Sequence, residues 1–210
     1  MLWYKSWIDT RWRFVLTLVV LVVFACGTVM SFPMVQRLVA QIPQTPVIAD
    51  EELQQEFTDS LEAMRTFTGY AWTQWFAGNF IGLLTLAAAL LGAGSPLVRS
   101  GTGALFSLAL PASRERWIGT RAGVGLAELF VLALAPSIAF TVLAPIVDQQ
   151  FSLVDAVVYG LCAFVIASAF FAVSMLLSTL FNDVWRPMLL TVVAAIVVAG
   201  IGTLFPDGGL

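Results

Sequence analysis

The sequence predicts an all-α protein that crosses a lipid bilayer several times. Of its 210 residues, 60% are hydrophobic and only 11% are charged, and the mean hydropathy is +0.92. A soluble domain of this length cannot hide so much apolar surface, because the surface-to-volume ratio limits the size of its core. Five stretches with few or no charges are each long enough to cross the membrane as a helix of about 20 residues. These features disfavour a soluble enzyme, a disordered chain and a nucleic-acid-binding protein.

We place the five membrane-spanning helices at residues 14–32, 72–91, 117–147, 155–181 and 187–205. The second charge-free stretch, residues 66–98, would be about 50 Å long as one helix, so one of its ends is expected to be interfacial or irregular. We interpret the first span as retained rather than cleaved as a signal peptide, since its flanks lack a convincing cleavage site. All seven tryptophans lie within a few residues of a predicted span end, which is typical of the aromatic belts at membrane interfaces.

Two segments outside the spans have helical periodicity. In residues 1–13 the tryptophans share one helical face, which predicts an interfacial helix that leads into the first span. In the external loop, residues 33–71, apolar side chains recur at helical spacing over 53–67. Prolines, beginning with Pro33, are expected to keep the chain before this amphipathic helix extended. The external helix is either a solvated lid packed on the spans or a surface for a substrate or partner.

Charge is distributed unequally between the two sides that five spans define. One side carries three acidic residues and eight of the ten basic ones, namely Lys5, Arg11, Arg13, Arg99, Arg114, Arg116, Arg121 and Arg186. The other side carries two basic and nine acidic residues. Because cytoplasmic loops are enriched in lysine and arginine, we expect the N-terminus in the cytoplasm. An odd number of spans would place the C-terminus outside.

The residue types of the chain exclude most catalytic chemistry. Histidine is absent, which excludes zinc sites and catalytic triads built on imidazole. The single lysine, Lys5, does not follow a glycine-rich turn, so the chain lacks the P-loop that binds ATP. Cys26 and Cys162 each lie in an apolar run and are expected to be buried small hydrophobes rather than a disulfide or metal pair. We therefore expect no catalytic residue, metal or cofactor in this chain.

Glu128 is the one ionisable residue well inside a predicted span. It lies roughly 16 Å along the helix from Trp117, which is expected near the interface. A carboxylate is expensive to bury in a membrane, so it usually faces the bundle interior or a wet cavity. Two uses remain open: a hydrogen bond to another helix as a packing device, or a place on a substrate or proton path.

Small residues and a proline predict further features of the spans. Gly78-x-x-x-Gly82 in the second span and Gly119-x-x-x-Gly123 at the start of the third have the spacing that lets helix backbones approach closely. Proline removes a helix hydrogen bond, so a kink or a short break is expected at Pro136 in the third span.

The large cytoplasmic loop, residues 92–116, contains the most informative segment. Residues 103–110 are apolar but too few to cross the membrane, and basic Arg99 and Arg114 flank them. A short apolar helix between basic flanks can lie at the membrane surface or insert into a groove of a partner protein.

Two segments carry a resemblance to a known family, SGTGALFSLALPASRERWIGTRA in this loop and LLSTLFNDVWRPMLL later in the chain. The first resembles the segment after the second span of ABC type-2 exporter permeases, where a short coupling helix ends in a pattern like Leu-(Ser or Ala)-Leu-Pro-x-Ser-Arg. The second is similar to the family's cytoplasmic turn between its fourth and fifth spans. The resemblance implies that the contact with the ATPase is made by Thr102, Gly103, Ala104, Leu105, Leu108, Leu110, Pro111, Ser113 and Arg114.

The resemblance implies a permease subunit of an ATP-driven transporter, of the exporter type, in the inner membrane of a bacterial cell. Such a subunit pairs with a second permease subunit, identical or different, and docks on ABC ATPase subunits that bind the ATP and Mg. Family members usually have six spans, so a sixth span would be absent or hidden in the long second or third stretch. Many members also carry an acidic residue before the loop helix, where Arg99 and Ser100 stand in this sequence. The alternative is a non-transporting membrane scaffold or sensor subunit.

The charge distribution predicts that Ser100 faces the cytoplasm. In a background with both native cysteines changed to alanine, Ser100→Cys should resist an impermeant maleimide added to intact cells and react after the cells are opened. Labelling from outside intact cells would overturn the topology.

Overall fold

A computed structural model describes residues 2–41, 61–62, 64–93, 114–181 and 183–204. Within these ranges the chain is almost wholly helical and contains no β-strand, which confirms the predicted all-α class. The helices in chain order are α1 (Leu2–Gln41), α3 (Phe67–Tyr70), the π-helix η1 (Ala71–Phe80), α4 (Ile81–Gly92), α6 (Arg114–Leu143), the 3₁₀-helix η2 (Ala144–Val147), α7 (Leu153–Leu180) and α8 (Trp185–Leu204).

Four helical runs are long and apolar enough to cross a membrane, namely Thr10–Gln41, Phe67–Gly92, Ile118–Val147 and Leu153–Leu180. They overlap the first four predicted spans, and the chain is therefore built as a membrane-embedded helical protein. The fifth predicted span, 187–205, overlaps a shorter apolar helix, Trp185–Ile201. The predicted total of five spans therefore stays a prediction.

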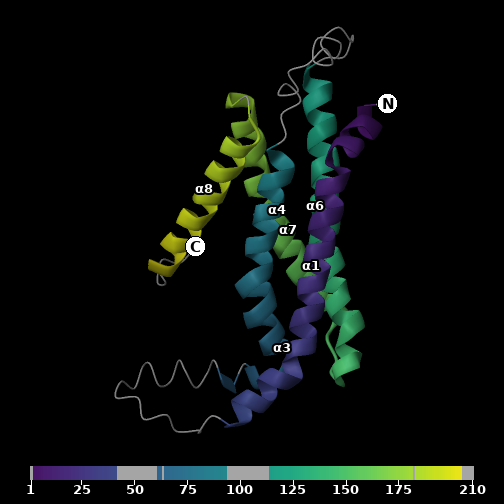
Figure 1. The fold of residues 1–210 in the computed structure, drawn as a ribbon, viewed down its shortest axis with the longest axis vertical. Coiled ribbons are helices and arrows are strands. Elements are labelled where there is room, and N and C mark those ends of the chain that lie inside the picture. The colour runs from purple at the N-terminus through teal and green to yellow at the C-terminus, as the bar shows by residue number, and fades with distance from the viewer. Residues whose placement is uncertain (1, 42–60, 63, 94–113, 182, 205–210) are drawn as a thin grey trace.

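The helices form an elongated bundle with two distinct ends (Figure 1). α1, α4, α6 and α7 run beside one another along the long axis, and α8 leaves the bundle at an angle after the turn that follows α7. At one end lie the start of α1, the end of α4, the start of α6 and the α7–α8 turn, and we call this the basic end. At the other lie the end of α1, α3 and the turn between α6 and α7, and we call this the aromatic end.

Helix α1 differs from its prediction in two ways. Residues 1–13 were expected to form a separate interfacial helix, but the described part continues without a break into the first span. No glycine or proline occurs between residues 2 and 26, so nothing in the sequence ends the helix there. Pro33 was expected to begin an extended segment, yet the helix continues past it to Gln41. A proline removes one helix hydrogen bond, and membrane helices tolerate this loss because neighbouring groups can satisfy the freed carbonyl.

Helix α6 passes through Pro136 without the short break that was one expectation. The helix tightens into η2 only at Ala144, one residue before Pro145, and Asp148 then ends it in the left-handed region at φ 55°. The second and third long stretches each form one helical run in their described parts, so neither contains a hidden crossing there. Most of the predicted external helix, 53–67, lies outside the described residues.

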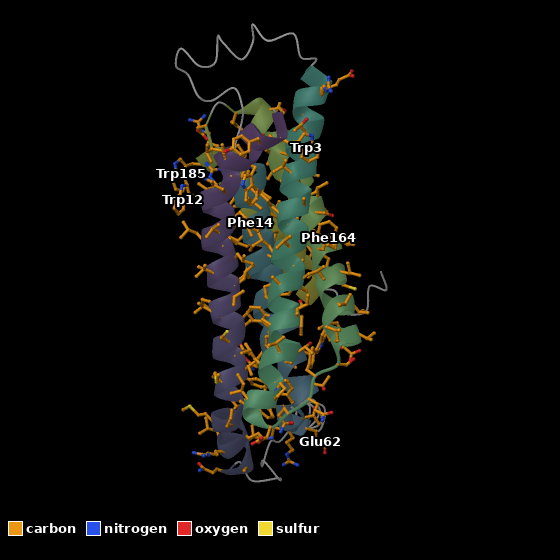
Figure 2. The ribbon with its side chains drawn as sticks, turned by 90° about the vertical axis from the view of Figure 1, so that its right-hand side faces the viewer. Trp3, Trp12, Phe14, Glu62, Phe164 and Trp185 are labelled. Atoms are coloured by element: carbon orange, nitrogen blue, oxygen red, sulfur yellow. The ribbon has the colours of Figure 1, made fainter. Side chains whose placement is uncertain are left out.

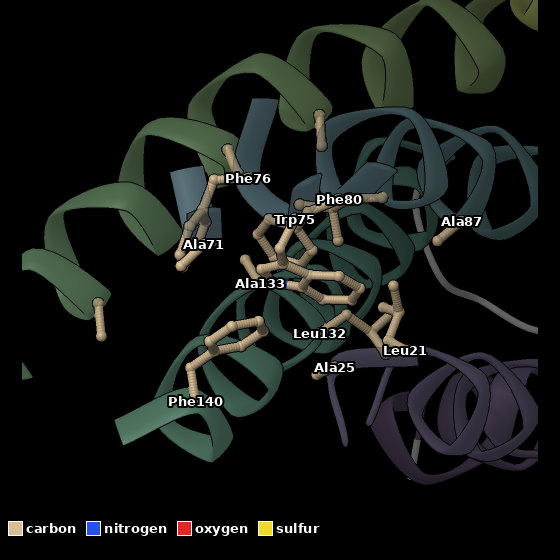
Figure 3. Packing of buried hydrophobic residues seen from close by; sticks show 14 of the residues in the cluster. Leu21, Ala25, Ala71, Trp75, Phe76, Phe80, Ala87, Leu132, Ala133 and Phe140 are labelled. Carbon is tan, nitrogen blue, oxygen red and sulfur yellow. The ribbon is translucent and has the colours of Figure 1, made fainter. Parts of the chain in front are cut away.

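The core of the bundle is aromatic toward the aromatic end (Figure 3). Trp75 of η1 is fully buried, and its ring centroid lies 5.2 Å from that of Phe80 and 5.6 Å from that of Phe140 on α6. Phe76 stacks on Phe151 at 6.0 Å. Each such pair adds about 0.5–1.5 kcal/mol to the energy of burial. The large apolar side chains that remain exposed line the outer faces of α1, α7 and α8, as expected of surfaces that meet lipid.

The tryptophans follow the belt prediction at the basic end but not throughout. Trp3, Trp12 and Trp185 gather at this end (Figure 2), and all three are well exposed. Trp75 is 0% exposed, so it is a core residue and not part of an interfacial belt.

Helices α4 and α7 approach each other closely where Gly92 meets Ser174. A Cβ atom added to Gly92 would lie 2.7 Å from Cβ of Ser174 and 2.9 Å from the carbonyl oxygen of Phe171. Beside this contact, the Ser174 hydroxyl donates a 2.7 Å hydrogen bond to the carbonyl of Ala89. The absence of a side chain at Gly92 is therefore what allows the interhelical hydrogen bond to form.

We predict that Gly92→Ala lowers the thermal stability of the purified protein in detergent, by about 1–3 kcal/mol, because the added methyl overpacks this contact. Gly27→Ala on α1 is the matched control, since a Cβ there meets nothing within 4 Å. The control should be neutral or slightly stabilising, because alanine is the better helix former. Equal unfolding temperatures for the two variants would contradict the close approach of α4 and α7.

Candidate functional site

The strongest candidate for a functional group inside the bundle is Glu128 on α6. Its side chain is 3% exposed, and its Oε1 accepts a hydrogen bond from the hydroxyl of Thr10 on α1. The Thr10 hydroxyl also lies 3.2 Å from the carbonyl oxygen of Ser6 and 3.4 Å from that of Trp7. Glu128 therefore faces the bundle interior and bonds to another helix. This contact matches the first of its two predicted uses, a hydrogen bond that packs one helix on another.

Small residues on α6 bring neighbouring helices up to this carboxyl group. A Cβ on Gly123 would lie 3.0 Å from the ring of Trp3 on α1. A Cβ on Gly125 would lie 2.5 Å from the ring of Phe171 on α7. α1 and α7 can thus pack against α6 within about one and a half turns of Glu128, which is itself almost fully buried.

The predicted small-residue motifs do not make these contacts as pairs. Of the second motif, Gly123 meets α1, but a Cβ on Gly119 would meet nothing within 4 Å. Of the first, Gly82 also meets nothing, and the one close neighbour of Gly78 is the carbonyl of Thr73 in the same helix. The spacing therefore identified Gly123 but missed Gly92, Gly125 and Gly160, the other glycines at helix contacts among the described residues.

The second carboxyl oxygen of Glu128 is the unusual feature of the site. Oε2 is buried and accepts no hydrogen bond from the described residues. Arg121, two helical turns earlier on α6, exerts a Coulomb attraction on the carboxylate. A buried acceptor left without a donor costs about 1–3 kcal/mol. The group can thus accept one further hydrogen bond or hold a proton.

A second polar contact ties α1 to the end of α4. Arg13, almost one turn after Thr10, donates from Nη1 to the carbonyl of Leu90 at 3.3 Å. This carbonyl belongs to the last turn of α4, where backbone acceptors lack intrahelical partners. The start of α1 is therefore linked by polar contacts to both α4 and α6 at the basic end.

The structure also describes residues of the types that bind metals or form disulfides. Among the described residues no group of three or more His, Cys, Asp or Glu side chains could hold a metal ion. Cys26 and Cys162 are free thiols on different helices. Burial was predicted for both, but Cys162 is exposed and Cys26 only partly covered, because their helix faces point out of the bundle. Lipid supplies the apolar surroundings that the sequence pattern indicated.

The predicted coupling residues lie almost entirely outside the described residues. Thr102, Gly103, Ala104, Leu105, Leu108, Leu110, Pro111 and Ser113 fall in 94–113, and Arg114 is described only as the first residue of α6. The structure does place the two helix ends that flank this loop, the end of α4 and the start of α6, at the basic end of the bundle (Figure 1).

We predict that Glu128→Leu destabilises the protein more than Glu128→Gln, by about 1–3 kcal/mol, because leucine leaves the Thr10 hydroxyl without its partner. The measurement is thermal unfolding in detergent. Thr10→Val should be destabilising alone but nearly neutral in the Glu128→Leu background, since the contact is already lost. Equal stability of the glutamine and leucine variants would argue against a structural hydrogen bond.

Comparison with protein families, with curated proteins and with solved structures finds no match to this chain.

Proposed function

We propose that this chain is the membrane-spanning permease subunit of an ABC transporter of the type-2, exporter-like class, and that it couples to a separate ATPase subunit. The observation that carries the proposal is the loop sequence between the second and third membrane runs, where an apolar segment ends in Leu108-Ala109-Leu110-Pro111-Ala112-Ser113-Arg114. The geometry supports it because both ends of the loop lie at the basic end, together with the α7–α8 turn that bears the second family-like segment.

The distribution of charge supports a cytoplasmic location for the basic end. Among the described residues, Arg11, Arg13, Arg116, Arg121 and Arg186 belong to helix segments at the basic end. The aromatic end holds Arg37 and Arg65. A cytoplasmic basic end satisfies the positive-inside rule and presents the loop to a soluble ATPase.

The proposed division of labour requires a mechanical link between two proteins. The ATPase subunits bind ATP and Mg, and two permease subunits form the translocation path. Nucleotide binding can then move the spans only by favouring one of two arrangements through differential contacts. A push on the loop reaches α4 and α6 directly, and it reaches α1 through Arg13 and Thr10.

The alternative proposal is a non-transporting scaffold or sensor subunit in the same membrane. Its support is the strongly acidic loop, residues 42–60, between the first two membrane runs. The two functions differ in their need for an ATPase, so a neighbouring reading frame that encodes a P-loop protein favours the transporter.

We predict that Leu105→Asp or Leu108→Asp leaves the permease inserted in the membrane but releases the ATPase or uncouples ATP hydrolysis from transport. Burying one leucine in a partner's groove is worth roughly 1.5–3 kcal/mol, and an unpaired charge there is penalised further. Arg114→Ala should have a milder effect, because an exposed ion pair contributes about 0–1 kcal/mol. The measurements are copurified ATPase per permease and substrate-stimulated ATP turnover.

Leu105→Met and Leu108→Met are the matched controls, since they keep an apolar side chain of similar volume. Both should retain the ATPase. Wild-type values for both aspartate variants would remove the coupling-helix assignment, and with it the main support for the transporter.

A further inference from the structure

The second membrane crossing contains an uncommon backbone form. Residues 71–80 form the π-helix η1, whose hydrogen bonds join residues five apart, between the α-helical segments α3 and α4. π-Helical geometry usually appears as single turns inside α-helices and often at functional sites. Ten consecutive residues in this form therefore require a specific stabilising environment.

The side chains show what stabilises η1. Its buried residues are Ala71, Trp75, Phe76 and Phe80, so they recur every four to five residues rather than every 3.6. This spacing places all four side chains on one face only if the helix is wider than an α-helix. The face packs on α6 and α7 through rings such as Phe140, so tertiary aromatic packing supports the π form.

The π form leaves one buried donor without a described partner and leaves no space for a side chain at one position. Nε1 of Trp75 is buried and donates no hydrogen bond to the described residues. At Gly78 a Cβ atom would lie 2.7 Å from the carbonyl oxygen of Thr73, five residues earlier, a distance that real Cβ atoms essentially never show. The π form thus admits only glycine at position 78. In an α-helix the Thr73 carbonyl faces residue 77 instead, and a side chain at 78 is acceptable.

The segments before and after η1 are held in place by separate polar contacts. On one side, the hydroxyl of Tyr70 lies 2.8 Å from Oγ of Ser31 and donates to the carbonyl of Thr28 at 3.1 Å, both on α1. On the other side, the end of α4 is held by two contacts: Ser174 of α7 bonds to Ala89, and Arg13 near the start of α1 bonds to Leu90. η1 therefore links two segments that are fastened separately, at opposite ends of the bundle.

We propose that η1 is a two-state element that can convert to an α-helix. An α-helix has fewer residues per turn and a longer rise per residue, so conversion lengthens the second crossing and rotates α3 relative to α4. Conversion separates Tyr70 from Thr28 and Ser31 and changes the packing of Trp75. Aromatic packing and the Tyr70 hydrogen bonds favour the π form, whereas Nε1 of Trp75, which lacks a described acceptor, disfavours it. Such opposing contributions are what an element with two accessible conformations requires.

The distance across η1 tests this directly. Spin labels at Thr68→Cys and Leu86→Cys, both exposed positions, flank the segment in a Cys26→Ala, Cys162→Ala background. In liposomes, Gly78→Ala should shift the main inter-label distance to longer values by a few ångström, because alanine excludes the π form. Gly82→Ala is the matched control in the adjoining α-helix, where a Cβ meets nothing within 4 Å, and it should keep the parent distance.

A second variant tests the proposal in case Gly78→Ala does not fold. Tyr70→Phe keeps the ring but removes both hydrogen bonds to α1, so the longer distance should gain population. If Gly78→Ala and Tyr70→Phe both keep the parent distance, or if the one of them that folds does so, the proposal is overturned. An equal shift in Gly78→Ala and Gly82→Ala would do the same, because the effect would not be specific to the π form. The measurement needs no ATPase or substrate, so its outcome is independent of the proposed transport function.

Discussion

The need to satisfy polar groups away from water governs how this bundle holds together. Lipid is as apolar as leucine, so apolar side chains gain little by meeting each other instead of lipid. Helices in a membrane are held instead by close packing and by hydrogen bonds between them. The chain uses both: Thr10 with Glu128 joins α1 to α6, Arg13 with Leu90 joins α1 to α4, and Ser174 with Ala89 joins α7 to α4. Gly92 lies at the last of these contacts, where the serine hydroxyl reaches a backbone carbonyl because the two helices are close.

The two ends of the bundle satisfy their polar groups in different ways. At the basic end, charged and hydroxyl groups find partners on other helices, and arginines can also reach the membrane surface. At the aromatic end, rings fill the interior, and Tyr70 supplies hydrogen bonds to α1 at Ser31 and Thr28. Trp75 is the exception, because its ring is packed on all sides but its Nε1 lacks a described acceptor. Packing has taken precedence over hydrogen bonding at this position.

The sequence predicted the features that depend on composition and length. It did not predict the features that are determined by contacts between helices. Hydropathy located the four long membrane runs, because each run must match the membrane thickness. The rarity of a carboxylate inside a span predicted the interior position of Glu128, but nothing in the sequence selected Thr10 as its partner. Pro33 was expected to end α1, since a local rule cannot include the neighbours that tolerate the proline. The π-helix was not predicted, because Trp72 and Ala77 are apolar too, and only packing against α6 and α7 selects Ala71, Trp75, Phe76 and Phe80 as the buried face.

Helix α1 connects the two ends physically. It bonds to α6 through Thr10 and to the second crossing through Thr28 and Ser31. These points are 18 residues or more apart on one uninterrupted helix, about 27 Å at 1.5 Å per residue. A continuous helix resists compression along its axis, so a displacement of α6 at the basic end would be carried along α1 to Tyr70 and the start of η1. The continuity of α1 through Pro33 keeps its last turns aligned with this path, whereas a helix that ended at residue 32 would have left Ser31 in a frayed terminal turn.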